Sequence, residues 1–423
     1  MADLPLKGIR VIDLTVVLAG PYAAMFLADF GAEVIRVESI QHFPPGTRGQ
    51  FARPAAGDVY PNKDPGKRPW NRYPMFNTMA RNKRSMTVDF TRPEGMEIFK
   101  RLVRVSDVVI ENYVPEVMDK LGITYEMLKS EKPDIIFAKM SGYGDTGDYR
   151  DYRAMAMSVD HPIGHAALRW YRDLDPTNMD SCAFEDPMMG VTGVFAIVSA
   201  LHHRNRTGKG QALDMCLAEV GMTSLPLAYM DYSMNGRVHD KLGNRDPVAA
   251  PCGVFRCLGQ DKWVSISIFN DEEWEAFGRI VGEEWVQDPR FNNVLSRQKN
   301  QDELEPLVEA WTSRHGDYEV MYLLQNVGIA AGPVLDDEAA CNDPHLNARG
   351  FFVEESQEDV GTHLYPGFIT RMSKTPCQVW RGPVRLGEDN EYVYKKVLGI
   401  SNAEYETLVE TGHIGTEYAP GVR

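Results

Sequence analysis

The stretch GIRVIDLTVVLAGPYAAMFLADFGAEVIRVE, Gly8–Glu38, decides the fold of this 423-residue chain. It begins and ends with short apolar runs, and an alanine-rich apolar segment of helix length lies between them. This pattern is typical of a strand, a helix and a second strand that pairs in parallel with the first. The alternation continues through SMTVDF, PEGMEIFKRLVRVS, DVVIENY and DIIFAKMSGYG, as far as about residue 145. The sequence therefore predicts an α/β fold with a parallel, doubly wound, Rossmann-like sheet.

We predict two domains and a C-terminal extension. The large domain covers residues 1–225 and ends after a long apolar helix expected over Pro187–Arg204. GVFRCL and KWVSISI are typical of a hairpin, and DEEWEAFGRIVG of a helix, which predicts a smaller α+β domain over residues 226–335. Residues 336–423 contain short strands and turns, and we expect them to form an extension that returns to the large domain.

Charge and cysteine content narrow the class of protein. Sixty acidic and 45 basic residues give a net charge of −15. This argues against nucleic acid or an anionic membrane as a partner, because both select basic surfaces. The six cysteines form no close CxxC pair, so neither a disulfide framework nor a zinc module is indicated. No stretch has the features of a signal peptide or the roughly 20 apolar residues of a membrane span, so we expect a cytoplasmic protein.

Two loops are candidates for ligand binding. DLTVVLAGPYAA, Asp13–Ala24, follows the first predicted strand, where open α/β sheets bind ligands. It contains no GxGxxG pattern, so a cradle for a dinucleotide pyrophosphate is not indicated, and a simple strand-to-helix connection explains it as well. Ile40–Tyr73 is rich in Pro, Gly and Arg and too long for a tight connection, so we expect a functional or partner-contacting loop.

A basic cluster precedes a later strand of this acidic chain. Residues 81–84, Arg-Asn-Lys-Arg, supply three cations in four positions. Arg offers a forked set of donors and Lys a point charge, so the cluster suits a phosphate group. A solvated positive turn is an equally good structural interpretation.

Two other polar segments give weaker indications. His161 and His165 in HPIGH lie four residues apart, but the Pro and Gly between them disfavour a helix that would align both rings. Because no further ligands have suitable spacing, we expect no metal site. ALRWYRDLDP, Ala167–Pro176, suits either the lining of a pocket for a carboxylated aromatic acid or a packed loop.

Asp186 lies just before the long apolar helix. Asp is among the best N-cap residues, and Pro suits the first helical position, so a helix cap explains this residue on local pattern alone. A carboxylate is also able to act as a nucleophile. The local sequence leaves both roles open.

Five motifs occur in an order that resembles one enzyme family. They are VIDLTVVLAGPYAAMFLADFGAEVIRVE, NKRSMTVDF, VVIENYVPEVMDKLGITYEML, AKMSGYGDTGDY and EDPMMGVTGVFAIVSALHHRNRTGKGQALDMCL. With GIAAGPVLDDEAACNDPHLNARGFF and GPVRLGEDNEYVYKKVLGI, the similarity extends over nearly the whole chain. The chain resembles the class III CoA-transferases, the formyl-CoA and carnitine CoA-transferase group that also includes 2-methylacyl-CoA racemases.

The resemblance implies an architecture and a mechanism. In this family a CoA-binding Rossmann-type domain is joined to a small domain, and two ring-shaped chains interlock as a homodimer or as a heteromer with a related subunit. Asp186 and Gly190 match the D-x-x-x-G motif of the nucleophile. The aspartate would form a mixed anhydride with the acyl group and then an aspartyl-CoA thioester. We expect no permanently bound cofactor, because CoA and acyl-CoA are substrates.

Nine positions match those that bind CoA in the family. They are Val17 and Ala19 in the first loop, Asn82, Lys83 and Arg84 for phosphates, Asn112 and Tyr113 near the adenosine, Lys120, and Tyr143. The chain departs from the formyl-CoA branch in two ways. Val16 and Leu18 stand where that branch has His and Gln, and its GGGG run is missing.

Further differences from the family motifs bear on the alternative functions and on the substrates. The racemase branch has a GHD motif, and Met155 stands where its His would be, which disfavours racemisation. A CoA-binding subunit without chemistry is a further alternative, but the retained Asp186 argues against it. The apolar Leu18 and the WYR segment suggest a larger or aromatic acid, with benzylsuccinate as a candidate acceptor and succinyl-CoA as a candidate donor.

Overall fold

The structure is a computed structural model that describes residues 4–54, 57, 59–171, 173–174, 177, 183–239 and 241–422. The chain forms two compact units. The first consists of residues 1–165, 181–230 and 350–423, and the second of residues 166–180 and 231–349. The first unit thus contains the N-terminal α/β region together with the last 74 residues of the chain, 350–423.

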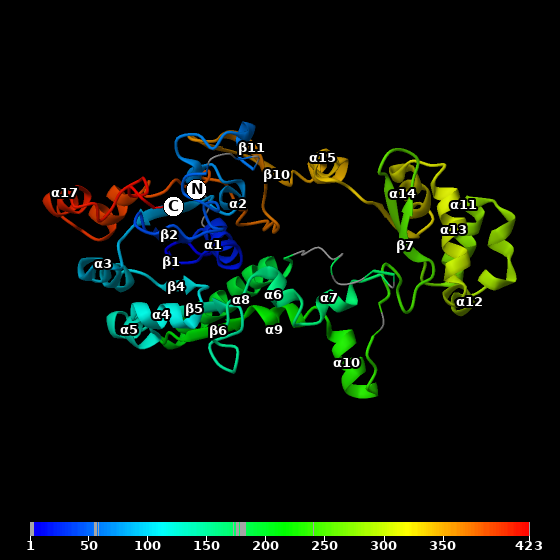
Figure 1. Ribbon diagram of the computed structural model, residues 1–423, viewed down its shortest axis with the longest axis horizontal. Helices are drawn as coiled ribbons and strands as arrows, with labels where there is room; N and C mark the ends of the chain where they lie inside the picture. Colours follow the sequence, from blue (N-terminus) through cyan, green and yellow to red (C-terminus); the bar gives the residue numbers. More distant parts are fainter. Residues whose placement is uncertain are drawn as a thin grey trace. The chain divides into compact units, whose positions relative to one another are not determined.

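A six-stranded parallel sheet lies at the centre of the first unit (Figure 1). Its strand order is β3-β2-β1-β4-β5-β6. The strands are β1 (Arg10–Asp13), β2 (Glu33–Glu38), β3 (Lys83–Thr87), β4 (Val108–Glu111), β5 (Ile136–Ser141) and β6 (Ala212–Cys216). The order reverses between β1 and β4, and ligands bind such sheets at the carboxyl ends of the strands near the reversal. The predicted doubly wound α/β fold is confirmed.

Helices cover both faces of this sheet because side chains alternate along each strand. Val11 joins one apolar core with α1 (Ala19–Asp29) and α8 (Glu185–Thr207). Its neighbour Ile12 joins the opposite core, which contains residues of α3, α4, α5 and a C-terminal π-helical turn. These four elements are α3 (Pro93–Arg104), α4 (Pro115–Leu121), α5 (Tyr125–Glu131) and η6 (Tyr392–Val397).

The segment expected to be a functional loop, between Ile40 and Tyr73, is folded around a buried arginine. Arg48 is fully buried and donates to both carboxylate oxygens of Glu38, at 2.6 and 2.7 Å. Phe43 and Trp70 of the same segment pack with Tyr418 near the C-terminus. The segment therefore joins the end of β2 to the C-terminal tail.

Shorter elements complete the first unit. They are η1 (Pro61–Lys63), η2 (Pro69–Asn71), α2 (Pro74–Thr78), α6 (Ala156–Asp160), α9 (Leu217–Met222), the hairpin strands β10 (Phe352–Gln357) and β11 (Gly361–Pro366), and α17 (Asn402–Glu410). Two helices, α7 (His165–Leu168) and α10 (Pro226–Asn235), cross from one unit to the other.

The second unit contains an antiparallel sheet in the order β7-β8-β9. Its strands are β7 (Cys252–Arg256), β8 (Trp263–Ser267) and β9 (Ala330–Pro333). An aromatic core that includes Trp274, Phe277 and Trp311 joins this sheet to its helices. The helical elements are α11 (Asp271–Val281), η4 (Glu284–Gln287), η5 (Pro289–Phe291), α12 (Val294–Lys299), α13 (Gln301–Thr312), α14 (Asp317–Gln325), α15 (Asp337–Cys341) and α16 (Pro344–Ala348). Among the described residues, no helix is long and apolar enough to cross a membrane.

Candidate functional site

Asp186 is the second residue of α8 and not its cap. The helix begins at Glu185, and the residue before it, Phe184, makes no side-chain cap hydrogen bond. The interpretation of Asp186 as an N-cap is therefore wrong, because Pro187 is tolerated within the first turn and the helix starts earlier than expected. The Asp186 carboxylate instead accepts a hydrogen bond from the backbone N–H of Ala19. Ala19 is the first residue of α1, so its N–H has no partner within its own helix.

Gly190 brings the starts of α1 and α8 together. A Cβ at this position would lie 2.7 Å from the Cβ of Tyr22 and 3.3 Å from the carbonyl oxygen of Ala19. Only a residue without a side chain allows this separation. The glycine of the D-x-x-x-G motif is thus one turn after Asp186, where it lets Ala19 reach the carboxylate.

Burial shapes the electrostatics of Asp186. It raises the pKa of the carboxyl group to about 6, against the opposing effect of the Ala19 hydrogen bond. The group is still ionised at neutral pH, and its partly buried position reduces its solvation. A poorly solvated carboxylate at the starts of two helices is suited to nucleophilic attack on an electrophilic carbon.

The loop between β1 and α1 is held in a strained conformation. Val17 has a φ of 62°, which is rare for a β-branched residue. Its N–H donates to Thr47 Oγ1 at 3.0 Å. Asn112 accepts from the Val16 N–H at 2.7 Å and donates to the Val16 carbonyl at 2.9 Å. Val17 and Asn112, two predicted binding residues, thus fix the course of the loop that precedes Ala19.

A cavity of about 460 Å³ opens at the carboxyl ends of β1, β2, β3 and β4. Its lining comes from four strand ends, from α4 and from the C-terminal tail: Leu14, Thr15, Val16, Arg36, Val37, Glu38, Ser39, Gln41, His42, Pro44, Asp89, Phe90, Thr91, Tyr113, Val117, Lys120, Leu121 and Tyr418. Among the predicted CoA-binding residues, Tyr113 and Lys120 line this cavity. The cavity lies where the strand order predicts a ligand site.

The charged groups of the cavity differ in how far they are neutralised. Arg36 lies 3.1 Å from Glu38 and 3.5 Å from Asp13. Arg36 and Asp13 are buried, and the side chain of Glu38 is only 6% exposed. Burial raises the pKa of Glu38, but Arg48 and Arg36 outweigh it and lower that pKa to about 2. Lys120 is exposed and lies 2.5 Å from Glu116, its neighbour one turn earlier. Because Lys120 is exposed and Arg36 is buried between two carboxylates, Lys120 is the cation of the lining better placed to meet a charged ligand.

The predicted phosphate contacts Asn82, Lys83 and Arg84 lie elsewhere. They stand at the start of β3, the amino edge of the parallel sheet, whereas the cavity is at the carboxyl edge. Lys83 is buried and donates to Asp13 at 3.2 Å. Asn82 is buried and donates to Asp29 at 2.9 Å. The structure therefore does not bring these residues to the cavity.

Arg84 and Tyr143 are also not among the residues that line the cavity. Arg84 pairs with Asp389 at 2.9 Å and stacks on the ring of Tyr392 at 3.8 Å. It lines a separate hollow of about 420 Å³. The Tyr143 hydroxyl donates to the Ser158 carbonyl at 2.5 Å, which ties the GYG turn to α6.

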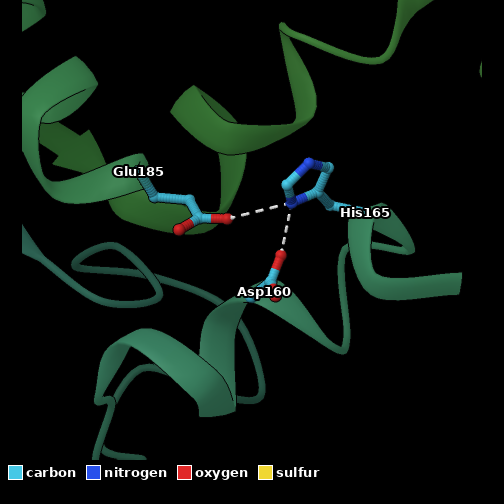
Figure 2. A group of neighbouring side chains, drawn as sticks. All are labelled: Asp160, His165 and Glu185. Carbon is cyan, nitrogen blue, oxygen red and sulfur yellow. Dashed lines mark hydrogen bonds and ion pairs between the residues drawn. The ribbon is translucent and has the colours of Figure 1, made fainter. Parts of the chain in front are cut away.

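Glu185, the residue before Asp186, meets Asp160 and His165 in a largely buried cluster (Figure 2). His165 Nδ1 is 2.5 Å from Asp160 Oδ1 and 3.7 Å from Glu185 Oε1. Burial and the neighbouring carboxylates Asp160 and Asp186 raise the pKa of Glu185 to about 7. His161, the other histidine of HPIGH, is exposed, and its ring bonds the Met157 carbonyl. Sequence spacing missed this cluster because Glu185 comes from a different helix.

Other residues singled out in the sequence lie outside the described residues or in the second unit. Cys182, and Arg172, Asp175 and Pro176 of the ALRWYRDLDP run, lie outside them. Tyr171 of that run lines a pocket of about 370 Å³ within the second unit, and its hydroxyl accepts from Asn244.

Several cavity residues were not found from the sequence. Gln41, His42 and Tyr418 line the cavity, and Thr47 holds Val17. The composition of the segment after Ile40 indicated a functional loop without indicating which of its residues would matter. No local pattern links Tyr418 to a cavity built by the first strands.

Comparisons with known proteins show which family the chain belongs to. The model of CoA-transferase family III matches residues 6–390. The succinyl-CoA–D-citramalate CoA-transferase of Chloroflexus aurantiacus is 30% identical over 406 residues, covering 96% of either chain. The β subunit of a succinyl-CoA–L-malate CoA-transferase from the same organism is 31% identical, covering 96% of this chain and 97% of the relative.

A solved structure gives the same result. The crystal structure of a CAIB/BAIF family protein from Brucella suis matches with a TM-score of 0.80 and 31% sequence identity. The match covers 93% of this chain and 99% of that one. The chain therefore belongs to CoA-transferase family III and is a transferase.

Proposed function

We propose that this chain transfers CoA from an acyl-CoA to a free carboxylic acid, with Asp186 as the nucleophile. One observation carries the proposal. The Asp186 carboxylate is poorly solvated, accepts the Ala19 N–H, and adjoins the loop whose first residues line the cavity. The same loop thus connects a ligand cavity with a nucleophile.

The first half of the reaction moves the acyl group to the enzyme. An oxygen of Asp186 attacks the thioester carbonyl carbon, and the carbon–sulfur bond breaks. The products are a mixed anhydride of Asp186 and a CoA thiolate, so most of the thioester free energy is kept. Negative charge develops near the N-termini of α1 and α8, which favour it.

The second half moves CoA to the acceptor. The thiolate attacks the Asp186 carbonyl carbon, which gives an aspartyl-CoA thioester and releases the donor acid. The acceptor carboxylate attacks this thioester, releases the thiolate and forms a new anhydride. The thiolate then attacks the acceptor acyl carbon, which gives the new acyl-CoA and restores Asp186. No net proton or electron is required.

We place the nucleotide end of CoA in the cavity of about 460 Å³. Tyr113 offers an aromatic ring, and Lys120 offers an exposed cation for a phosphate. Val17, Ala19 and Asn112 contribute by fixing the loop between this cavity and Asp186. Asn82, Lys83 and Arg84 contribute to the stability of the sheet, because their side chains are engaged in internal contacts.

Succinyl-CoA is the donor we propose, with a dicarboxylic acid as the acceptor. Both named relatives are described as succinyl-CoA-dependent, with citramalate or malate as the second acid. Benzylsuccinate, the acceptor expected from the sequence, is an aromatic member of the same class. A screen of the purified chain with succinyl-CoA against malate, citramalate, glutarate, oxalate and benzylsuccinate identifies the acceptor.

Asp186→Asn tests the proposal. The amide is nearly isosteric and lies in the first helical turn, so the fold is expected to stay intact, with a stability change of about 1 kcal/mol or less. Transfer is expected to be lost almost completely, because an amide cannot form the anhydride. Glu272→Gln, an exposed acid in the first turn of α11, is the matched control and keeps activity. Substantial transfer by well-folded Asp186→Asn would refute the assigned role.

A further inference from the structure

Glu185, the residue before the proposed nucleophile, lies against two titratable side chains from other helices. Asp160 ends α6, His165 begins α7, and Glu185 begins α8. Figure 2 shows the three side chains directed toward one another, and both carboxyl groups are fully buried. A Cβ at Gly221 of α9 would lie 2.9 Å from Cγ of Glu185, so this glycine leaves room for the buried side chain.

The contact between the two carboxyl groups requires a proton. Glu185 and Asp160 share a side-chain hydrogen bond. Ionised carboxylates only accept hydrogen bonds, so one of the two groups carries an O–H. His165 Nδ1 is 2.5 Å from Asp160 Oδ1 but 3.7 Å from Glu185 Oε1, which favours the anion on Asp160. Glu185 thus keeps the proton and donates it to Asp160. Burial, Asp160 and Asp186 accordingly raise the pKa of Glu185 to about 7.

The other elements packed against α8 bring no further charge to this cluster. Their titratable side chains are Tyr22 and Asp29 of α1, Lys139 of β5, Asp214 and Cys216 of β6, and Glu219 of α9. Lys139 and Asp214 alternate with residues of the core shared with α8, so they face the other side of the sheet. Asp29 lies at the far end of α1 and pairs with Arg81 at 2.8 Å, and Glu219 is exposed.

We propose that Glu185 is a positioning residue of the transfer reaction, an inference that rests on the proposed role of Asp186. By keeping its proton, Glu185 leaves Asp186 as the only anion in the first turn of α8. The positive end of the helix dipole then acts on Asp186 and on the intermediates formed from it. An ionised Glu185 would place a second negative charge there. It would repel the CoA thiolate and the acceptor carboxylate, which are both anions.

The pH dependence of kcat/KM for succinyl-CoA tests this role. For the wild type we expect a bell-shaped profile, with an acid limb near pH 6 from Asp186 and an alkaline limb near pH 7 from Glu185. Glu185→Gln keeps a neutral donor toward Asp160, so it is expected to stay active at about pH 6.5 and to lose the alkaline limb. At about pH 8 it is then expected to be about tenfold more active than the wild type.

Glu219→Gln is the matched control. It removes an exposed acid on α9 and is expected to keep the wild-type profile. Circular dichroism verifies that each variant is folded. A folded Glu185→Gln protein that retains the wild-type alkaline limb, or that is inactive at every pH while Glu219→Gln is active, would overturn the role of Glu185.

Infrared difference spectroscopy without substrate detects the proton directly. The wild type is expected to show, at about pH 6, a carbonyl band of a protonated carboxyl group that Glu185→Gln lacks and that disappears by about pH 9. Identical spectra of the two proteins would also overturn the role of Glu185. Because this readout needs no turnover, it separates a failure of this inference from a failure of the proposed function, which activity of Asp186→Asn would reveal.

Discussion

Single side chains around β1–β3 divide into those that hold the sheet and those that face the cavity. Lys83 is buried against Asp13, whereas Lys120 is exposed at the cavity rim. Both were predicted to contact CoA, and the sequence did not separate them. A lysine is able to reach the ligand only if it is exposed and lies at the carboxyl ends of the strands. A run of charges in the sequence predicts neither property.

Lys83→Ala is expected to destabilise the fold. It leaves Asp13 buried with Arg36 as its remaining cation, and loss of one partner of a buried pair costs about 3–5 kcal/mol. Lys120→Ala, an exposed counterpart, is expected to change stability by no more than about 1 kcal/mol. It is expected to weaken CoA binding by about tenfold or more if the ammonium meets a phosphate.

Denaturant unfolding and calorimetric titration with CoA and 3′-dephospho-CoA separate the two effects. A Lys83→Ala protein as stable as the wild type that has lost CoA affinity would show that our assignment of the two lysines is inverted.

Glu38 gives the fold a defined acid sensitivity. Arg48 and Arg36 lower its pKa from an ordinary value of 4.5 to about 2 in the folded chain. A lowered pKa contributes stability that is present above the unfolded value and is lost as pH falls through the folded one. The free energy of unfolding is therefore expected to fall by about 3 kcal/mol more in the wild type than in Glu38→Gln between pH 5 and pH 2. Parallel acid-dependent slopes in urea titrations of both proteins would contradict this.

At the scale of elements, the contact between α1 and α8 positions the nucleophile. Gly190→Ala places a Cβ 2.7 Å from the Tyr22 Cβ and 3.3 Å from the Ala23 nitrogen, and neither can move without moving α1. We expect a loss of about 1–3 kcal/mol in stability and a large fall in kcat, because Asp186 is displaced from the Ala19 N–H.

Gly193→Ala is the matched control on the same helix. Its Cβ would meet Met140 Cε at 2.8 Å, the flexible end of a side chain that is able to shift. Steady-state kinetics and thermal unfolding of both variants test the contact. Equal kcat values for Gly190→Ala and Gly193→Ala would show that the α1–α8 contact does not position Asp186.

Elements were easier to predict than the start of α8. The alternation of apolar runs predicted the parallel sheet, because strand and helix periods are local properties. The preference of Asp for N-cap positions misplaced Asp186, since the helix begins one residue before it. The first turns of α8 pack against α1 through Gly190, and no local pattern encodes that packing.

At the scale of the whole molecule, the cavity depends on distant parts of the chain. Tyr418 meets residues of the first strands there, and all the described lining residues belong to the first unit. The sequence predicted that the tail returns to the large domain but not where it would line a cavity. A contact between residues so far apart in the sequence is seen only in the folded structure.

We propose that the chain assembles through α10. No residue of this helix is buried, and its exposed apolar side chains include Leu227, Met230 and Met234. Exposed apolar side chains on one helix are suited to a protein interface. A dimer, or a heteromer with a related subunit, is expected at micromolar concentration. It is expected to be insensitive to reductant, since the five described cysteines are free.

Met234→Glu is expected to dissociate this assembly. Leu295→Glu, which is equally exposed on α12, serves as the control and is expected to leave it intact. Light scattering over a dilution series measures both. A wild type that stays monomeric at micromolar concentration, with or without a purified related subunit, would rule out the assembly.

The most direct test of the central claim is chemical trapping at Asp186 during turnover. Wild-type protein is incubated with succinyl-CoA and quenched with hydroxylamine or borohydride, and its peptides are analysed by mass spectrometry. We expect modification at Asp186 in the wild type and none in Asp186→Asn. Active wild-type enzyme without a modified Asp186 peptide, or with the same modification at another carboxylate, would contradict the assignment of the nucleophile.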